Sequence, residues 1–230
     1  MTVPVKLYYL AVDNKEITQN NIEFRYREDI MSAFLGPIHY WMYNKIQVQE
    51  KMTEDISNLA VNRGWITEKQ AEEYKGSSNR PLDEAIDLGN IHGWLQGMIN
   101  DAEGKYASLV SRLLNAEKDR MEALKVLAFE EGKNNSAREG SSAFDIYKDL
   151  DDALLNGMPC DRINVVNRQE ENCVAWDQTQ DIHRTHWDAV GGNPDWYYEL
   201  RLAYMKGVAS GAGFDVVREG STGFAIVKAA

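Results

Sequence analysis

The chain has 230 residues, of which 43% are hydrophobic and 27% are charged, and its formal net charge is −11. This length suits one large domain or two small ones and is sufficient to bury a core. Nucleic-acid-binding proteins usually carry a basic face, and no block of Lys and Arg occurs in this sequence. The charge therefore argues against a nucleic-acid partner and predicts repulsion from an anionic membrane surface.

Localisation is predicted from the apolar segments and the cysteines. No apolar run approaches the roughly 20 residues that span a bilayer, and the first residues, MTVPVK, do not resemble a secretory signal. Cys160 and Cys173 are expected to be free thiols in a reducing compartment, with a single disulfide as the alternative. These features predict a cytoplasmic protein without a membrane partner and leave a homo-oligomer open. No CxxC or HxxxH spacing occurs, so no metal site is predicted, and no cofactor can be named.

The first 132 residues are expected to form a helix-rich region. Val5–Val12 is rich in β-branched and aromatic residues, which favours a strand or an extended arm. A long helical region is predicted from about Asn21 to Val61, with a kink or restart at Pro37, because proline removes a backbone donor and clashes with the preceding turn. Helix-compatible sequence then runs from Leu82 to about Glu131.

The first half of that last stretch contains an unusual series of glycines. Glycine costs about 1 kcal/mol per helix position relative to alanine. Such a series therefore predicts either a close approach between helices or room for a ligand. The four residues are Gly89, Gly93, Gly97 and Gly104.

A change of texture separates residues 1–132 from residues 142–230. Gly132–Ser141 has several turn formers and almost no apolar residues, which predicts a linker. The order of elements after it favours an α+β fold, with a small antiparallel sheet covered by helices on one face. The expected elements are a helix at Ser142–Leu155, a hairpin of Arg162–Asn167 and Cys173–Gln178, short and long helices at His183–Ala189 and Trp196–Ser210, and a hairpin of Phe214–Glu219 and Gly223–Lys228.

One signature occurs twice in the helical region. The run LGPIHYW at 35–41 recurs as LGNIHGW at 88–94, and Ile46 and Glu50 match Ile99 and Glu103 at the same offset. A duplicated helical unit, or convergence on one packing geometry, explains the match.

Helical spacing gives the duplication a geometric meaning. Each histidine shares a mainly apolar face with a glutamate eleven residues later, which is Glu50 for His39 and Glu103 for His92. An antiparallel pair of helices would bring each histidine toward the other helix's glutamate, whereas a parallel pair would bring the two histidines together. Either histidine can be a core residue, a pocket residue or a metal ligand. We expect His39 and His92 to bind the ligand, with Trp41 and Trp94 as pocket walls.

A second cluster, DIHRTHWD at 181–188, concentrates titratable groups between a predicted strand and a predicted helix. Backbone donors are free at helix starts, and a carboxylate beside a histidine can orient it for acid/base work. His183 with Asp181 is therefore the predicted catalytic pair, and Arg184 is expected to contact the ligand. Cys173, one strand earlier, is a candidate nucleophile, with a buried strand residue as the alternative.

The order of elements over about Phe144–Lys228, with the turn Gly192–Asp195 and the last hairpin around Gly220, resembles the L-2-amino-thiazoline-4-carboxylic acid hydrolase family. The resemblance implies an α+β part behind a helical region and hydrolysis of a small cyclic C–N bond. The family has a cysteine where this chain has His183, and another near Thr222–Phe224. The family's cysteine chemistry therefore does not transfer to these positions.

Together these observations predict a small-molecule enzyme, a hydrolase or lyase, that acts on a small polar or cyclic substrate with a histidine as acid or base. Its pocket is expected between the helical region and the C-terminal sheet. The alternatives are a non-catalytic ligand-binding or sensor protein, and a haem or metal protein that uses the helical histidines.

Overall fold

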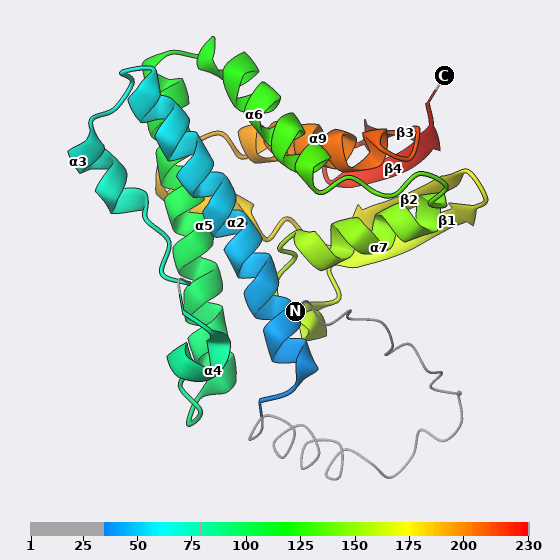
Figure 1. Ribbon diagram of the computed structural model, residues 1–230, viewed down its shortest axis with the longest axis horizontal. Helices are drawn as coiled ribbons and strands as arrows, with labels where there is room; N and C mark the ends of the chain where they lie inside the picture. The colour runs from blue at the N-terminus through cyan, green and yellow to red at the C-terminus, as the bar shows by residue number, and fades with distance from the viewer. Residues whose placement is uncertain (1–34, 79, 230) are drawn as a thin grey trace.

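The structure, a computed structural model, describes residues 35–78 and 80–229 (Figure 1). The predicted strand or arm at Val5–Val12 and the start of the first predicted helix lie outside these residues. The helical region consists of α2 (Pro37–Asn62), α3 (Glu68–Ala71), η1 (Glu72–Tyr74), α4 (Leu82–Ala85), α5 (Ile91–Ala116) and α6 (Arg120–Asn134). The later elements are α7 (Ala143–Ala153), η2 (Pro159–Asp161), β1 (Asn164–Glu170), β2 (Cys173–Gln178), α8 (Arg184–Ala189), α9 (Pro194–Ser210), β3 (Phe214–Glu219) and β4 (Gly223–Lys228). None of the helices in the described ranges has the length and apolar character of a membrane span.

The helix-compatible stretch from Leu82 to Glu131 forms three separate helices, because the chain breaks after α4 and again after α5. The first break follows from local capping. The side chain of Asn90 accepts a hydrogen bond from the backbone N–H of Gly93 at 3.1 Å and so begins α5. A Cβ on Gly93 would lie 2.3 Å from Asn90 Nδ2, so a larger residue there would shift the capping side chain. Both copies of the motif are therefore helix starts, since α2 begins at Pro37.

The two helices that begin with the motif pack side by side and run in the same direction (Figure 1). Equivalent residues of the two copies thereby share one core cluster, and the pairs Met42 with Leu95 and Ile46 with Ile99 belong to it. Of the two arrangements that the sequence left open, the parallel one is present. The chain returns from the end of α2 to the start of α5 through residues 63–90, which include α3, η1 and α4.

The C-terminal part confirms the predicted α+β class. Its four strands form an antiparallel sheet in the order β1-β2-β4-β3. Trp176 of β2 pairs with Phe224 of β4, and both are buried. Helix α7 packs against β2 and β4, α9 packs against β3, and the two helices contact each other, so they cover the same face (Figure 1).

A glycine contact joins the helical region to the sheet region. Gly132 lies in α6, although it was predicted to begin the linker, and a Cβ there would lie 2.0 Å from the carbonyl oxygen of Tyr204 in α9. A Cβ on Gly207 of α9 would lie 2.1 Å from the carbonyl oxygen of Phe129. These glycines allow α6 and α9 to approach closely, whereas Gly104 in α5 has nothing within 4 Å of an added Cβ. The larger core cluster contains residues from both sides of the predicted linker.

Candidate ligand-binding site

The duplicated motif brings His39 and His92 together at the starts of α2 and α5, with their ring centroids 5.7 Å apart. His39 is buried, and its Nδ1 accepts a hydrogen bond from the backbone N–H of Gly36 at 2.9 Å. Burial, together with the neighbouring His92, lowers the pKa of His39 below its ordinary value. His39 thus caps its own helix, while His92 is exposed.

The two glutamates of the repeat occupy equivalent positions and serve different partners. Glu50 accepts hydrogen bonds from the backbone N–H groups of Ser77 and Ser78, each at 2.9 Å, and from the Ser78 hydroxyl. It therefore anchors the loop after η1. Glu103 instead accepts a hydrogen bond from Nδ1 of His183 at 2.9 Å, which joins α5 to the start of α8.

The pair of Glu103 and His183 is sealed inside the molecule. The side chain of His183 is 1% exposed, and its ring stacks on Tyr197 with centroids 3.9 Å apart. Burial alone would raise the pKa of Glu103, but the charge and hydrogen bond of His183 hold that pKa below its ordinary value. Glu103 Oε2 and His183 Nε2 have no hydrogen-bond partner among the described residues.

Asp181 and Arg184 contact each other near the start of α8. The carboxylate of Asp181 accepts hydrogen bonds from the hydroxyl of Tyr198 at 2.7 Å and from the backbone N–H of Arg184 at 3.1 Å. The guanidinium of Arg184 lies 3.3 Å from the same carboxylate and is more than half exposed. The predicted catalytic pair is not in contact, because the hydrogen-bond partner of His183 is Glu103 rather than Asp181.

The paired histidines His39 and His92, the single His183 and Cys173 do not converge on one site. His92 and Glu103 are eleven residues apart on α5, about 16 Å along the helix, so His183 lies far from the paired histidines. Cys173 begins β2, five residues before Gln178, which is about 16 Å along the strand. The other end of β2, at Gln178, is the end near Asp181, because the hydroxyl of Tyr198 contacts both of these side chains. Cys173 therefore lies at the end of β2 that is remote from Asp181.

Of the two tryptophans expected to line a pocket, Trp41 does so and Trp94 does not line either of the two cavities described below. The indole N–H of Trp41 donates to Asp152 at 2.8 Å. Trp94 instead packs near Tyr43, with ring centroids 5.9 Å apart, at the interface of α2 and α5.

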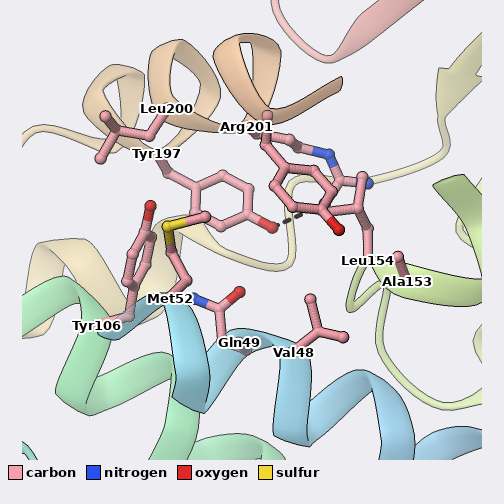
Figure 2. Close-up of a pocket in the computed structure, with 10 residues that line it drawn as sticks. Val48, Gln49, Met52, Tyr106, Ala153, Leu154, Tyr197, Leu200 and Arg201 are labelled. Atoms are coloured by element: carbon pink, nitrogen blue, oxygen red, sulfur yellow. Dashed lines mark hydrogen bonds between the residues drawn. The ribbon is translucent and has the colours of Figure 1, made fainter. Parts of the chain in front are cut away.

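A small cavity of about 30 Å³ lies between α2, α5, α9 and the end of α7 (Figure 2). Three of the residues that line it have a buried polar atom without a partner among the described residues: Gln49 Nε2, Arg201 Nε and Tyr204 OH. One water needs about 10–15 Å³, so the volume of this space corresponds to about two waters. It is too small for a substrate.

Arg201 connects the small cavity to a larger one. Its Nη1 donates to the hydroxyl of Tyr197 at 2.7 Å, and its Nη2 donates to the side-chain oxygen of Asn156 at 2.6 Å. Asn156 lines the second cavity, which has a volume of about 160 Å³. This space accepts a ligand of several heavy atoms. We call it the Lys45 pocket, and it is lined by Trp41, Lys45, Tyr147, Asp151, Asn156, Gly157, Met158, Pro159, Arg162, Ile163 and Asn164.

Lys45 is the most unusual group in that pocket. It is 2% exposed, and its Nζ lies 3.6 Å from the centroid of the Trp41 ring. The nearest carboxylate oxygen with which it pairs, Asp151 Oδ1, is 4.0 Å away, beyond hydrogen-bond distance. Burial lowers the pKa of Lys45 to about 8, with Arg201 acting in the same direction against the opposing charges of Asp151 and Asp152.

The rest of the Lys45 pocket adds one acceptor and one cation. Asn164 donates to Asp151 at 3.3 Å, and its own side-chain oxygen is buried without a partner among the described residues. Arg162 lies on the exposed rim with a left-handed backbone, φ 48° and ψ 50°. A left-handed backbone at a residue other than glycine is uncommon and often accompanies a functional position.

Sequence reasoning missed Lys45, although the repeat carries a signal for it. The same offset that aligns the two histidines places Lys45 against Met98 and Gln49 against Ala102. A lysine at the position where the other copy has a methionine is the feature of the sequence that could have drawn attention to Lys45. No group of three or more His, Cys, Asp and Glu side chains within residues 35–78 and 80–229 is placed to hold a metal ion.

Comparison of the chain with protein-family models, with curated proteins and with solved structures gave no match.

Proposed function

We propose that this protein binds a small carboxylate-bearing molecule in the Lys45 pocket. One observation carries the proposal: the ammonium of Lys45 is 2% exposed and lines a cavity of about 160 Å³, and the Asp151 carboxylate with which it pairs lies 4.0 Å away, beyond hydrogen-bond distance. A buried charge without hydrogen bonds is costly. A ligand that supplies oxygen acceptors would therefore offset a cost that the folded protein already bears.

The class of ligand follows from the charges around the cavity. Lys45 and Arg162 contribute two cations to the lining and Asp151 one carboxylate, while Asp152 acts on Lys45 from beside the lining. An arginine and a lysine together suit a carboxylate, because the guanidinium can donate two parallel hydrogen bonds. The unpartnered oxygen of Asn164 would accept from a hydroxyl or an amine on the same ligand.

The test is a panel of small ligands measured by calorimetry and by thermal unfolding at neutral pH. Acetate, L-lactate, pyruvate and L-2-amino-thiazoline-4-carboxylate should bind and raise the melting temperature with increasing concentration. The uncharged amide of lactate should bind at least about tenfold more weakly, which corresponds to about 1.4 kcal/mol.

Two variants control the panel. Lys45→Met removes the ammonium with a side chain that the repeat accepts at the equivalent position, Met98, and it should abolish binding. Lys75→Met removes a lysine whose side chain is 67% exposed and should change nothing. Equal binding of carboxylates by the wild type and Lys45→Met would reject the proposal.

A second candidate function is the hydrolase or lyase with His183 as acid or base. The observation in its favour is that Glu103 orients His183 through Nδ1 and leaves Nε2 without a partner among the described residues. Against it, His183 lines neither cavity. Hydrolysis of L-2-amino-thiazoline-4-carboxylate that is lost in a folded His183→Asn variant would support it, and the absence of turnover in the wild type would reject this substrate.

A further inference from the structure

We propose that Lys45 forms a covalent imine with a small 2-oxo acid, so that the ligand of the Lys45 pocket carries a carbonyl group next to its carboxylate. This inference rests on the proposed function, because the ligand must first enter the same pocket. It adds a chemical step that a simple carboxylate, such as lactate, cannot undergo.

The geometry around Nζ suits a nucleophile better than a structural cation. A lysine that stabilises a fold is normally held by direct hydrogen bonds to carboxylates or carbonyl oxygens. Lys45 Nζ has none among the described residues, and it lies over the Trp41 ring beside an open volume. The Trp41 ring and the charges of Asp151 and Asp152 favour the ammonium, whereas burial favours the neutral amine.

The protonation state agrees with this geometry. Burial lowers the pKa of Lys45 to about 8, so part of the protein population carries Lys45 as a neutral, nucleophilic amine near physiological pH. The charged groups that act on it are Asp151 and Asp152 from α7 and Arg201 from α9. A desolvated lysine of this kind is the usual nucleophile toward carbonyl substrates.

The step balances without a cofactor. The ammonium of Lys45 first loses a proton, which the carboxylate of Asp151, 4.0 Å away, can accept through a small movement or one water. The free electron pair of Nζ then attacks the carbonyl carbon, and a proton passes from nitrogen to oxygen to give a carbinolamine. Asp151 returns its proton to the hydroxyl, water leaves, and an iminium remains, so the net change is ammonium plus ketone to iminium plus water.

The carboxylate of the 2-oxo acid has its own partner. Arg162 contributes a cation from the exposed rim of the pocket, while Lys45 lies buried within it. A ligand that spans the two would present its carboxylate to the guanidinium and its carbonyl to the amine. This arrangement predicts a preference for 2-oxo acids over simple aldehydes and ketones of the same size.

The experiment traps the imine by reduction. The full chain is incubated with pyruvate and sodium cyanoborohydride near pH 7.5, and the product is analysed by intact mass and by peptide mapping. We expect one reduced pyruvate unit on Lys45, formed more than about tenfold faster than on any exposed lysine, because an ordinary lysine is almost fully protonated at this pH. Acetone should label Lys45 more slowly than pyruvate does.

The controls separate this inference from the proposed function. Lys45→Arg keeps the positive charge and cannot form an imine, so it should lose the adduct, whereas Lys75→Arg should label like the wild type. Binding of lactate without any pyruvate adduct on Lys45 would overturn the imine and leave the proposed function standing. Labelling spread evenly over exposed lysines would overturn it in the same way, and absence of both binding and labelling would overturn both proposals.

Discussion

The Nδ1 atom of His183 lies 2.9 Å from Glu103 Oε1, and this buried contact ties the second copy of the duplicated motif to the C-terminal part of the chain. Eighty residues separate the two side chains in sequence. The contact therefore forms only when α5 and α8 pack together.

Breaking this pair should destabilise the protein strongly. Glu103→Ala leaves a buried histidine without its acceptor, and removal of one partner of a buried pair typically costs about 3–5 kcal/mol. We expect a loss of this size in the free energy of unfolding measured in urea. The double variant Glu103→Leu with His183→Leu should cost clearly less than the sum of the single variants. A control, His92→Gln, alters an exposed residue and should change stability by less than about 0.5 kcal/mol.

The same pair predicts a loss of stability in acid. The pKa of Glu103 is lower in the folded than in the unfolded chain, so its contribution is present above its ordinary pKa of 4.5 and is lost as the pH falls below that value. Urea midpoints from pH 6 to pH 3 should show the wild type losing its advantage over Glu103→Gln in that interval. A difference between the two proteins that stays constant down to pH 3 would contradict the assignment.

The buried ammonium of Lys45 should lower the free energy of unfolding of the wild-type protein. The change of its pKa from 10.5 to about 8 corresponds to a penalty of about 3 kcal/mol on the charged form. Lys45→Met should therefore raise the free energy of unfolding at pH 7 by up to about 3 kcal/mol. Since the wild-type lysine is neutral in the folded state above pH 8, this gain should shrink as the pH rises from 8 to 10.5.

The duplicated motif shows which parts of the fold can be predicted from the sequence and which cannot. The repeat itself could be read from the sequence, and so could the two possible pairings of its histidines. The choice between them depends on the path of residues 63–90, where several short elements form by local capping that no long-range pattern reveals. Asn90 is a typical N-cap residue, but helix-compatible sequence on both sides of it gives no sign of the break between α4 and α5.

The candidate site was harder to predict than the fold. His183 stands out in sequence because it lies in a cluster of titratable groups, but its partner Glu103 comes from another element, and burial separates both from the cavities. Lys45 in the run YNKIQ looks like a solvated helix residue. Its burial arises from the segment 151–164, which packs over it and lies more than one hundred residues later in the chain.

The glycines that allow close helix approach are Gly132 and Gly207, which are not in the glycine series that the sequence pattern pointed to. Gly132→Ala should destabilise the protein by about 3 kcal/mol or more, because the new Cβ meets the backbone of α9 at 2.0 Å and the backbone cannot move aside cheaply. Gly104→Ala lies in open space in α5 and should stabilise the protein by up to about 1 kcal/mol. Thermal unfolding of the two variants checks the pair, and equal effects would contradict the close approach of α6 and α9.

The most direct test of the central claim is an NMR titration of the isotope-labelled protein with L-lactate, a carboxylate that cannot form an imine. We expect the largest amide shifts at residues that line the Lys45 pocket, including Trp41, Lys45, Asn156 and Asn164, and no such shifts in Lys45→Met. Shifts confined to the surroundings of His183, or none at all, would contradict the assignment of the ligand site to Lys45.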